Sequence, residues 1–125
     1  MTEEQIALAK RAVACKWWKW LPGMLHGAVY ATATGSGRWQ HEPKLVSCYR
    51  VSDLTLRLDA DRLPDLTDPA TMGCLLALVR EAHGQTTLSP VSRGRRLWCL
   101  ADFGTTALQG ETEVELLVAA LEAAP

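Results

Sequence analysis

The stretch that decides the fold is Leu63–Gly84, which reads LPDLTDPATMGCLLALVREAHG. It carries the signals for both ends of a helix. The carboxylate of Asp68 can accept hydrogen bonds from free N–H groups of the first turn, Pro69 fits the first helical position, and Gly84 can take the left-handed conformation that ends a helix. We therefore predict a helix over Pro69–His83.

Apolar side chains cover most of the circumference of this helix. They recur at the spacing i, i+3, i+4 and i+7 of an amphipathic helix, and two more widen the stripe. These residues are Met72, Leu75, Leu76 and Val79, widened by Cys74 and Leu78. Because few positions other than Thr71, Arg80 and Glu81 are suited to water, we expect the helix to lie in the middle of the protein.

Two capping-box sequences predict further helices near the ends of the chain. In this motif a Thr hydroxyl and a Glu or Gln side chain three residues later satisfy each other's backbone N–H groups. Thr2–Gln5 predicts a helix that ends in Lys16–Trp20, just before Pro22, and Thr112–Glu115 opens a C-terminal helix. The expected buried stripes are Ile6, Ala9, Val13 and Trp17 in the first helix and Val114, Leu117, Val118 and Leu121 in the last.

Short strands are predicted between the helices. Turn residues at Thr34–Gly37 precede a short return over Arg38–Gln40, and Ser92–Arg95 joins a second hairpin. The other expected strands are Met24–Ala33, Leu45–Ser52, Leu54–Asp59, Thr86–Val91 and Arg96–Phe103. This order lacks strict β-α-β alternation, so we expect an α+β fold. It should be a single domain over residues 1–125, with a mainly antiparallel sheet of about five short strands and the central and C-terminal helices packed on one face.

Size and composition indicate a globular protein. The chain has 125 residues, of which 48% are apolar and 22% charged, enough for one core. Because no apolar run reaches the length of a membrane span and the acidic start is unlike a signal peptide, we expect a cytoplasmic protein without a membrane partner. The cysteines lie far apart in apolar surroundings, so free buried thiols are expected rather than disulfides or a zinc site. They are Cys15, Cys48, Cys74 and Cys99.

Residues typical of catalysis are scattered through the sequence. His26, His41 and His83 have no carboxylate or cysteine at ligand spacing, so structural or surface roles are favoured. Cys15 near a basic helix end is the candidate nucleophile, and a structural thiol is the preferred alternative. We therefore expect no enzyme activity, no catalytic residue, no cofactor and no metal ligand.

Two segments combine residue types that bind partners. Lys16–Trp20 reads KWWKW, which is typical of a protein-binding patch or a single-stranded nucleic-acid site, and equally of a tryptophan-rich corner of the core with lysines reaching solvent. Ser92–Arg96 presents guanidinium groups at a hairpin tip, suited to phosphate or carboxylate, with a solubilising turn as the alternative. The candidate partner-binding residues are Lys16, Trp17, Trp18, Lys19, Trp20, Arg93, Arg95 and Arg96.

Charge is distributed unevenly along the chain. The formal net charge is −1, yet Gln5–Ser52 contains seven lysines and arginines against the single acid Glu42. A basic region of this kind can bind nucleic acid, bind an acidic protein, or pair with the acidic remainder of its own chain. The sequence leaves these three alternatives open.

Three blocks, Arg11–Met24, Leu63–Ala82 and Leu117–Pro125, cover roughly a third of the chain. They resemble a group of small proteins of tailed bacteriophages and prophages. The resemblance implies a phage setting without an assigned activity, catalytic residue or cofactor. We therefore expect a non-enzymatic phage accessory protein that binds a host or phage protein in the cytoplasm of the infected bacterium, such as an anti-CRISPR-like inhibitor of a host-defence complex.

The alternative is a nucleic-acid-binding phage protein that uses the basic, tryptophan-rich N-terminal half. A homodimer is compatible with either function, through the C-terminal helix or a sheet edge.

Overall fold

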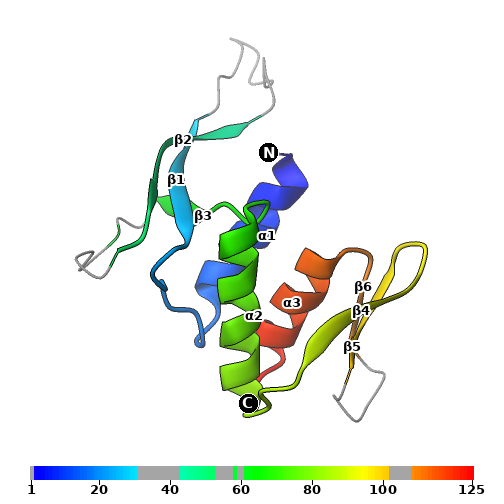
Figure 1. Ribbon diagram of the computed structural model, residues 1–125. Helices are drawn as coiled ribbons and strands as arrows, with labels where there is room; N and C mark the ends of the chain where they lie inside the picture. Colours follow the sequence, from blue (N-terminus) through cyan, green and yellow to red (C-terminus); the bar gives the residue numbers. More distant parts are fainter. Residues whose placement is uncertain (1, 31–42, 53–57, 59–60, 102–107) are drawn as a thin grey trace.

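The computed structural model describes residues 2–30, 43–52, 58, 61–101 and 108–125. In these ranges three helices lie between two small antiparallel sheets (Figure 1). The helices are α1 (Glu3–Ala14), α2 (Pro69–His83) and α3 (Glu113–Glu122). The strands of the first sheet are β1 (Leu25–Tyr30), β2 (Lys44–Arg50) and β3 (Arg62–Pro64), and those of the second are β4 (Ser89–Gly94), β5 (Leu97–Ala101) and β6 (Gln109–Gly110).

Helix α2 begins and ends at the residues that the sequence predicts. The side chain of Asp68 accepts a hydrogen bond from the backbone N–H of Thr71, Pro69 occupies the first turn, and Gly84 closes the helix with a φ of 66°. Leu75 and Leu78 of α2 are buried, and α2 packs against α3 in the centre of the molecule. The prediction of a central helix is therefore confirmed.

Helix α1 is shorter than predicted. Its capping box forms, since Thr2 and Gln5 satisfy each other's backbone N–H groups, but the helix ends at Ala14 and Cys15 is extended. The prediction that Lys16–Trp20 forms the last turn is wrong. Bulky side chains spread round a helix could not all reach one core, whereas the unwound chain lets all three tryptophans pack against it.

The expected single sheet is divided in two. The described strands pair only antiparallel, in the orders β2-β1-β3 and β4-β5-β6, so the fold class and strand direction are confirmed but one sheet of about five strands is not. The sheets lie on opposite sides of α2 and α3 (Figure 1). Because α2 stands in the sequence between β3 and β4, it separates the two groups of strands. The predicted segments Leu54–Asp59, apart from Leu58, and Arg38–Gln40 lie outside the described residues.

The core lies between the three helices and is closed by residues from the connections. Helix α3 is buried over most of its circumference, wider than the predicted stripe, while Met24, Leu66 and Leu88 fill the space beside the helices. In the ranges given above, no helix has the length and apolar character needed to cross a membrane.

Candidate functional site

The tryptophan segment Lys16–Trp20 forms the corner between α1 and β1, and its rings are half-buried. The indole N–H of Trp17 donates to the backbone carbonyl of Pro125 at 3.0 Å, and the Lys16 ammonium lies 5.8 Å from the centre of the Trp17 ring. The rings of Trp18 and Trp20 meet edge to face, with centroids 5.3 Å apart. This segment is therefore largely engaged in packing within the protein itself.

A row of rings continues from the tryptophan segment onto the first sheet. The Trp20 ring lies 5.7 Å from that of His26, which lies 6.5 Å from that of Tyr49. Nε of Arg62 donates to Nδ1 of His26 at 3.0 Å, so this nitrogen carries no proton. Burial, together with the charge of Arg62, lowers the pKa of His26. His26 is therefore a structural acceptor in this row.

Three cations of the basic N-terminal half pair with the acidic part of the same chain. Arg11 forms an ion pair with Glu122, and Nζ of Lys19 lies 2.7 Å from Oε1 of Glu81. Arg50 pairs with Asp68. Of the three alternatives that the charge distribution leaves open, internal pairing accounts for these cations.

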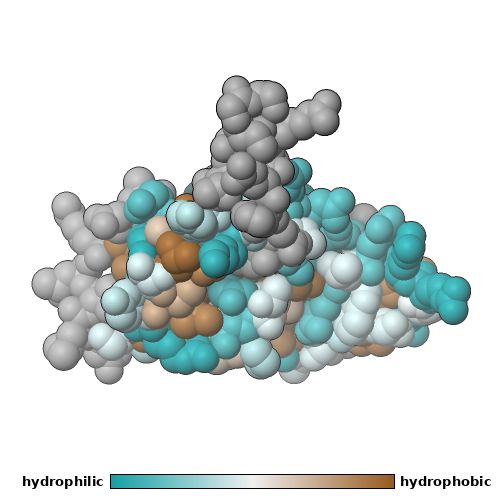
Figure 2. Space-filling model, turned by 90° about the horizontal axis from the view of Figure 1, so that it is seen from above, coloured by the Kyte–Doolittle hydropathy of each residue, from teal (hydrophilic) through white to brown (hydrophobic). Residues whose placement is uncertain are grey.

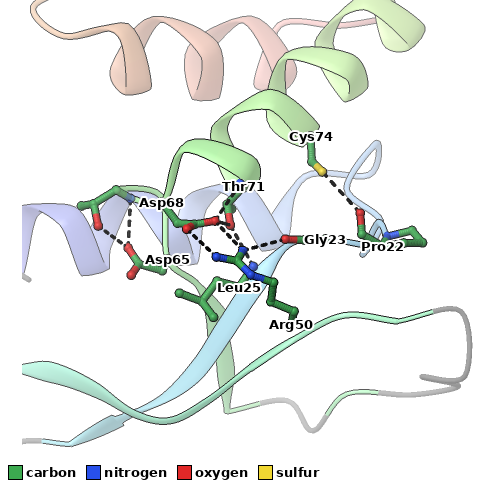
Figure 3. Close-up of polar contacts among 9 residues, drawn as sticks. Pro22, Gly23, Leu25, Arg50, Asp65, Asp68, Thr71 and Cys74 are labelled. Atoms are coloured by element: carbon green, nitrogen blue, oxygen red, sulfur yellow. Dashed lines mark hydrogen bonds and ion pairs between the residues drawn. The ribbon is translucent and has the colours of Figure 1, made fainter.

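The pair between Arg50 and Asp68 joins the first sheet to the start of α2 (Figure 3). Both terminal nitrogens of Arg50 donate to the Asp68 carboxylate, at 2.9 and 3.0 Å. The Thr71 hydroxyl donates to the same carboxylate and accepts from the N–H of Leu25 at 2.8 Å. The Arg50 hydrogen bonds hold the pKa of Asp68 well below its usual range. This cluster is a structural joint.

The tip of the β4–β5 hairpin has the opposite character. Arg93, Arg95 and Arg96 are exposed, and none of them has a hydrogen-bond or ion-pair partner among the residues that the structure describes. Gly94 and Arg96 both have positive φ, 154° and 56°, which turns the chain sharply between the strands. In Figure 2, hydrophilic residues cover the end of the molecule where this hairpin lies.

The two predicted binding segments do not form one site. The corner of Lys16–Trp20 lies on the side of α2 that faces the first sheet, whereas the tip Arg93–Arg96 projects on the other side, beyond α3 (Figure 1). A partner that contacts one of them leaves the other free.

Cys15, the candidate nucleophile, lies in a shallow hollow beside the Arg11–Glu122 pair. Its thiol donates to the carbonyl of Arg11, and burial followed by the charge of Glu122 raises its pKa. The thiol therefore stays protonated and weakly nucleophilic. The four cysteines are free thiols, but the expectation that they are buried is wrong: Cys48 is exposed, and Cys15, Cys74 and Cys99 are half-buried. Within the described residues, no group of three His, Cys, Asp or Glu is placed to hold a metal ion.

Sequence reasoning missed the exposed tyrosines of the first sheet. Tyr30 and Tyr49 are 50% and 65% exposed, and Arg62, which contacts Tyr49, belongs to a strand that was not predicted. Three-residue strands carry too little periodicity to be found from sequence. The positions of Tyr30 and Tyr49 in predicted strands were the available signals.

Comparisons with known proteins give no match: no family model, curated protein or solved structure matches this chain. The surfaces described above are therefore the basis for proposing a function.

Proposed function

We propose that this protein is a non-enzymatic accessory protein that binds an acidic surface of another protein through Arg93, Arg95 and Arg96. The observation that carries the proposal is the contrast between these arginines and the other described cations. Except for Lys10, the others contact a carboxylate, a carbonyl or an aromatic ring. Exposed arginines that are free to form paired hydrogen bonds with carboxylates are frequent anchors of protein interfaces.

The sequence resemblance supplies the setting of this proposal. Three blocks resemble small proteins of tailed bacteriophages and prophages, so we place the partner among host or phage proteins in the cytoplasm of the infected bacterium. An anti-CRISPR-like inhibitor of a host-defence complex is the specific form of the proposal. Such an inhibitor can act by occupying a surface, which requires charge and shape but no catalytic group.

The segment Lys16–Trp20 is proposed as a second contact area. Lys16 remains exposed, and the half-buried rings of Trp17, Trp18 and Trp20 leave part of their surface to solvent. The Nε1 atom of Trp18 is buried without a hydrogen-bond partner among the described residues, so the exposed ring surfaces and Lys16 are what this corner offers to a partner. Because the corner and the hairpin tip lie on different sides of the helices, substitutions can test them separately.

Support for nucleic-acid binding through the paired cations Arg11, Lys19 and Arg50 of the N-terminal half is weaker. Arg11, Lys19 and Arg50 would each have to give up a carboxylate partner before meeting a phosphate. If this surface did bind DNA or RNA, binding would weaken steeply as salt rises.

The experiment is a pull-down of the tagged protein from host lysate, with and without nuclease, analysed by mass spectrometry. The triple variant Arg93→Ala, Arg95→Ala and Arg96→Ala is compared with Lys10→Ala, which removes another exposed cation that has no partner among the described residues. A stoichiometric protein that survives nuclease and is lost at least tenfold with the triple variant supports the proposal. Equal capture by the triple variant, or loss of every captured protein on nuclease treatment, contradicts it. Thermal unfolding of the variants checks that they remain folded.

A further inference from the structure

The outer face of the β2-β1-β3 sheet carries aromatic and cationic side chains in a regular arrangement. Residues that pair directly across antiparallel strands lie on the same face, and residues two apart along a strand share it. Tyr30 pairs with Lys44 at one end of β1, and His26 pairs with Tyr49 at the other. The face comprises His26, Ala28 and Tyr30 of β1, Lys44, Val46 and Tyr49 of β2, and Arg62 and Pro64 of β3.

This face is open at its two tyrosines, although His26 and Pro64 on it are buried, and the other face packs inward except at the exposed Val29. Tyr49 is 65% exposed and Tyr30 is 50% exposed, and both are among the few large apolar side chains on the described surface. On the opposite face, Leu63 is buried and Leu45 packs against the core. Exposed rings on a sheet face with no role in the core are typical of a binding surface.

Each exposed tyrosine has its own cation. The Lys44 ammonium lies 5.7 Å from the centre of the Tyr30 ring, and the Arg62 guanidinium lies 5.9 Å from that of Tyr49. None of the described residues on this face is acidic. The face is therefore positively charged locally, although the whole chain carries a formal charge of −1.

The Tyr30–Lys44 pair and the Tyr49–Arg62 pair lie at opposite ends of this face, and the residues between them are apolar and do not project far. Tyr49 lies opposite His26, four residues from Tyr30 along β1, which corresponds to ~13 Å at ~3.3 Å per residue. Between them lie the small side chain of Ala28 and the half-buried Val46. An extended polymer with flat rings and negative charges can lie across this apolar stretch from one tyrosine to the other.

We propose that this face binds single-stranded DNA, with bases stacked on Tyr30 and Tyr49 and phosphates beside Lys44 and Arg62. Aromatic rings with interleaved cations are how single-stranded nucleic acids are bound without sequence preference. Two cations are too few for a duplex, whose binding depends on neutralising many phosphates. DNA already supplies the base faces and the phosphates that these side chains would contact, so the 2′-hydroxyl of RNA is not required.

Tyr49 is held in place before any ligand arrives. The ring of His26 and the guanidinium of Arg62 contact it, and the ring of Trp20 in turn contacts that of His26. A side chain that is already ordered loses little conformational entropy on binding. Tyr49 is therefore expected to contribute more than Tyr30.

The test is fluorescence anisotropy of a labelled twelve-nucleotide oligo-dT with the whole protein at low salt. Tyr49→Ala should weaken binding roughly 5- to 150-fold, the effect of losing one stacked base, and Tyr30→Ala should weaken it less. Tyr49→Phe keeps the ring and should bind as the unmodified protein does. Lys44→Gln should reduce the slope of log affinity against log salt by about 0.7. Val29→Ala, an exposed residue on the opposite face, is the matched control and should have no effect.

Several results would overturn this proposal. The first is no binding of oligo-dT at low salt, and the second is equal binding by Tyr49→Ala and the unmodified protein. The third is that the hairpin triple variant loses binding while the tyrosine variants keep it. At least tenfold tighter binding of oligo-U would overturn the choice of DNA. If Tyr49→Ala proves unfolded by thermal denaturation, Tyr49→Leu replaces it, since leucine keeps apolar bulk but cannot stack. Capture of the protein partner is measured separately and depends on the hairpin, so the two proposals can fail independently.

Discussion

The two sheets have the same number of described strands and the same antiparallel pairing, but they are joined to the helices differently. Polar groups hold the first sheet: the N–H of Leu25 donates to the buried Thr71 hydroxyl, and Arg50 pairs with Asp68 at the start of α2 (Figure 3). Shape holds the second sheet, because Leu100 is buried and Gly110 lies directly against the start of α3.

This difference decides what each sheet can present to a partner. The polar joint holds the first sheet at the end near α2, so its outer face with Tyr30 and Tyr49 stays open. The second sheet packs against α3 near Gly110, and the tip Arg93–Arg96 projects from it (Figure 1). The first sheet therefore offers a partner its outer face, whereas the second offers the tip of a hairpin. Substitutions at the two joints test this comparison.

The largest effect is expected at the joint of the second sheet. A Cβ atom at Gly110 would lie 2.6 Å from the backbone nitrogen of Leu116 and 3.0 Å from its Cα. Backbone cannot move aside as a side chain can, so Gly110→Ala should lower the free energy of unfolding by about 3 kcal/mol, the upper end of the usual cost of overpacking. Urea denaturation followed by tryptophan fluorescence measures this.

The matched control for that substitution is Gly73→Ala. Gly73 lies in the middle of α2, and a Cβ atom there would meet nothing within 4 Å. Alanine should therefore stabilise the helix by about 1 kcal/mol. If both substitutions changed stability alike, close approach of β6 to α3 would not be what holds the second sheet.

A smaller effect is expected at the polar joint of the first sheet. Thr71 is fully buried, and Thr71→Val leaves the N–H of Leu25 without its acceptor and removes a donor to Asp68. The expected loss is about 2 kcal/mol, within the range for an unsatisfied buried group. Hydrogen exchange of the Val51 and Leu100 amides should show faster opening on the side of the first sheet alone, since the Val51 N–H donates to the carbonyl of Met24 and keeps this acceptor in the variant. Equal acceleration at both amides would argue against separate joints.

The effect of Asp68→Asn should be smaller again and depend on pH. Because Arg50 holds the pKa of Asp68 below its ordinary value of 3.8, the carboxylate stabilises the folded state fully above that value. As pH falls below 3.8, the unfolded state binds the proton first and the stabilisation is lost. Asparagine still caps a helix but neither titrates nor pairs with arginine.

Urea midpoints measured between pH 7 and pH 2.5 test this prediction. The unmodified protein should be more stable than Asp68→Asn at neutral pH, and the gap should close in acid. If the difference in stability between the two proteins stayed constant with pH, the ion pair between Arg50 and Asp68 would not be its cause.

The sequence predicted α2 well because its signals are local: Asp68, Pro69 and Gly84 each act within one turn of the backbone. It did not predict the end of α1, because the packing of three tryptophans depends on helices distant in the chain. The same holds for the cations. Counting basic residues in Gln5–Ser52 could not show that Arg11 pairs with Glu122, more than a hundred residues away.

Among the candidate site residues, the hairpin arginines were the most predictable. A turn between two alternating segments places them at a tip whatever the rest of the fold does. The face with Tyr30 and Tyr49 depends on strand register and on Arg62 from a three-residue strand. A bulge at Ser47, where φ is 53°, shifts that register by one residue. Such a shift decides which side chains share a face, and no local pattern in the sequence predicts it.

The smallest change in stability is expected from Arg96→Gly. Arg96 has a φ of 56°, a conformation that costs an L-residue with a side chain free energy but is easily adopted by glycine. The substitution should therefore leave stability unchanged or raise it by up to ~1 kcal/mol, while it removes one of the three exposed guanidinium groups of the tip. Weaker partner capture by Arg96→Gly than by the unmodified protein could not be due to unfolding. Arg95→Ala has no such strain to relieve, so it should weaken capture without any gain in melting temperature. The contrary result is that Arg96→Gly raises the melting temperature and captures as much partner as the unmodified protein. Arg96 would then have no part in binding, and the contact would have to be made by other residues of the tip.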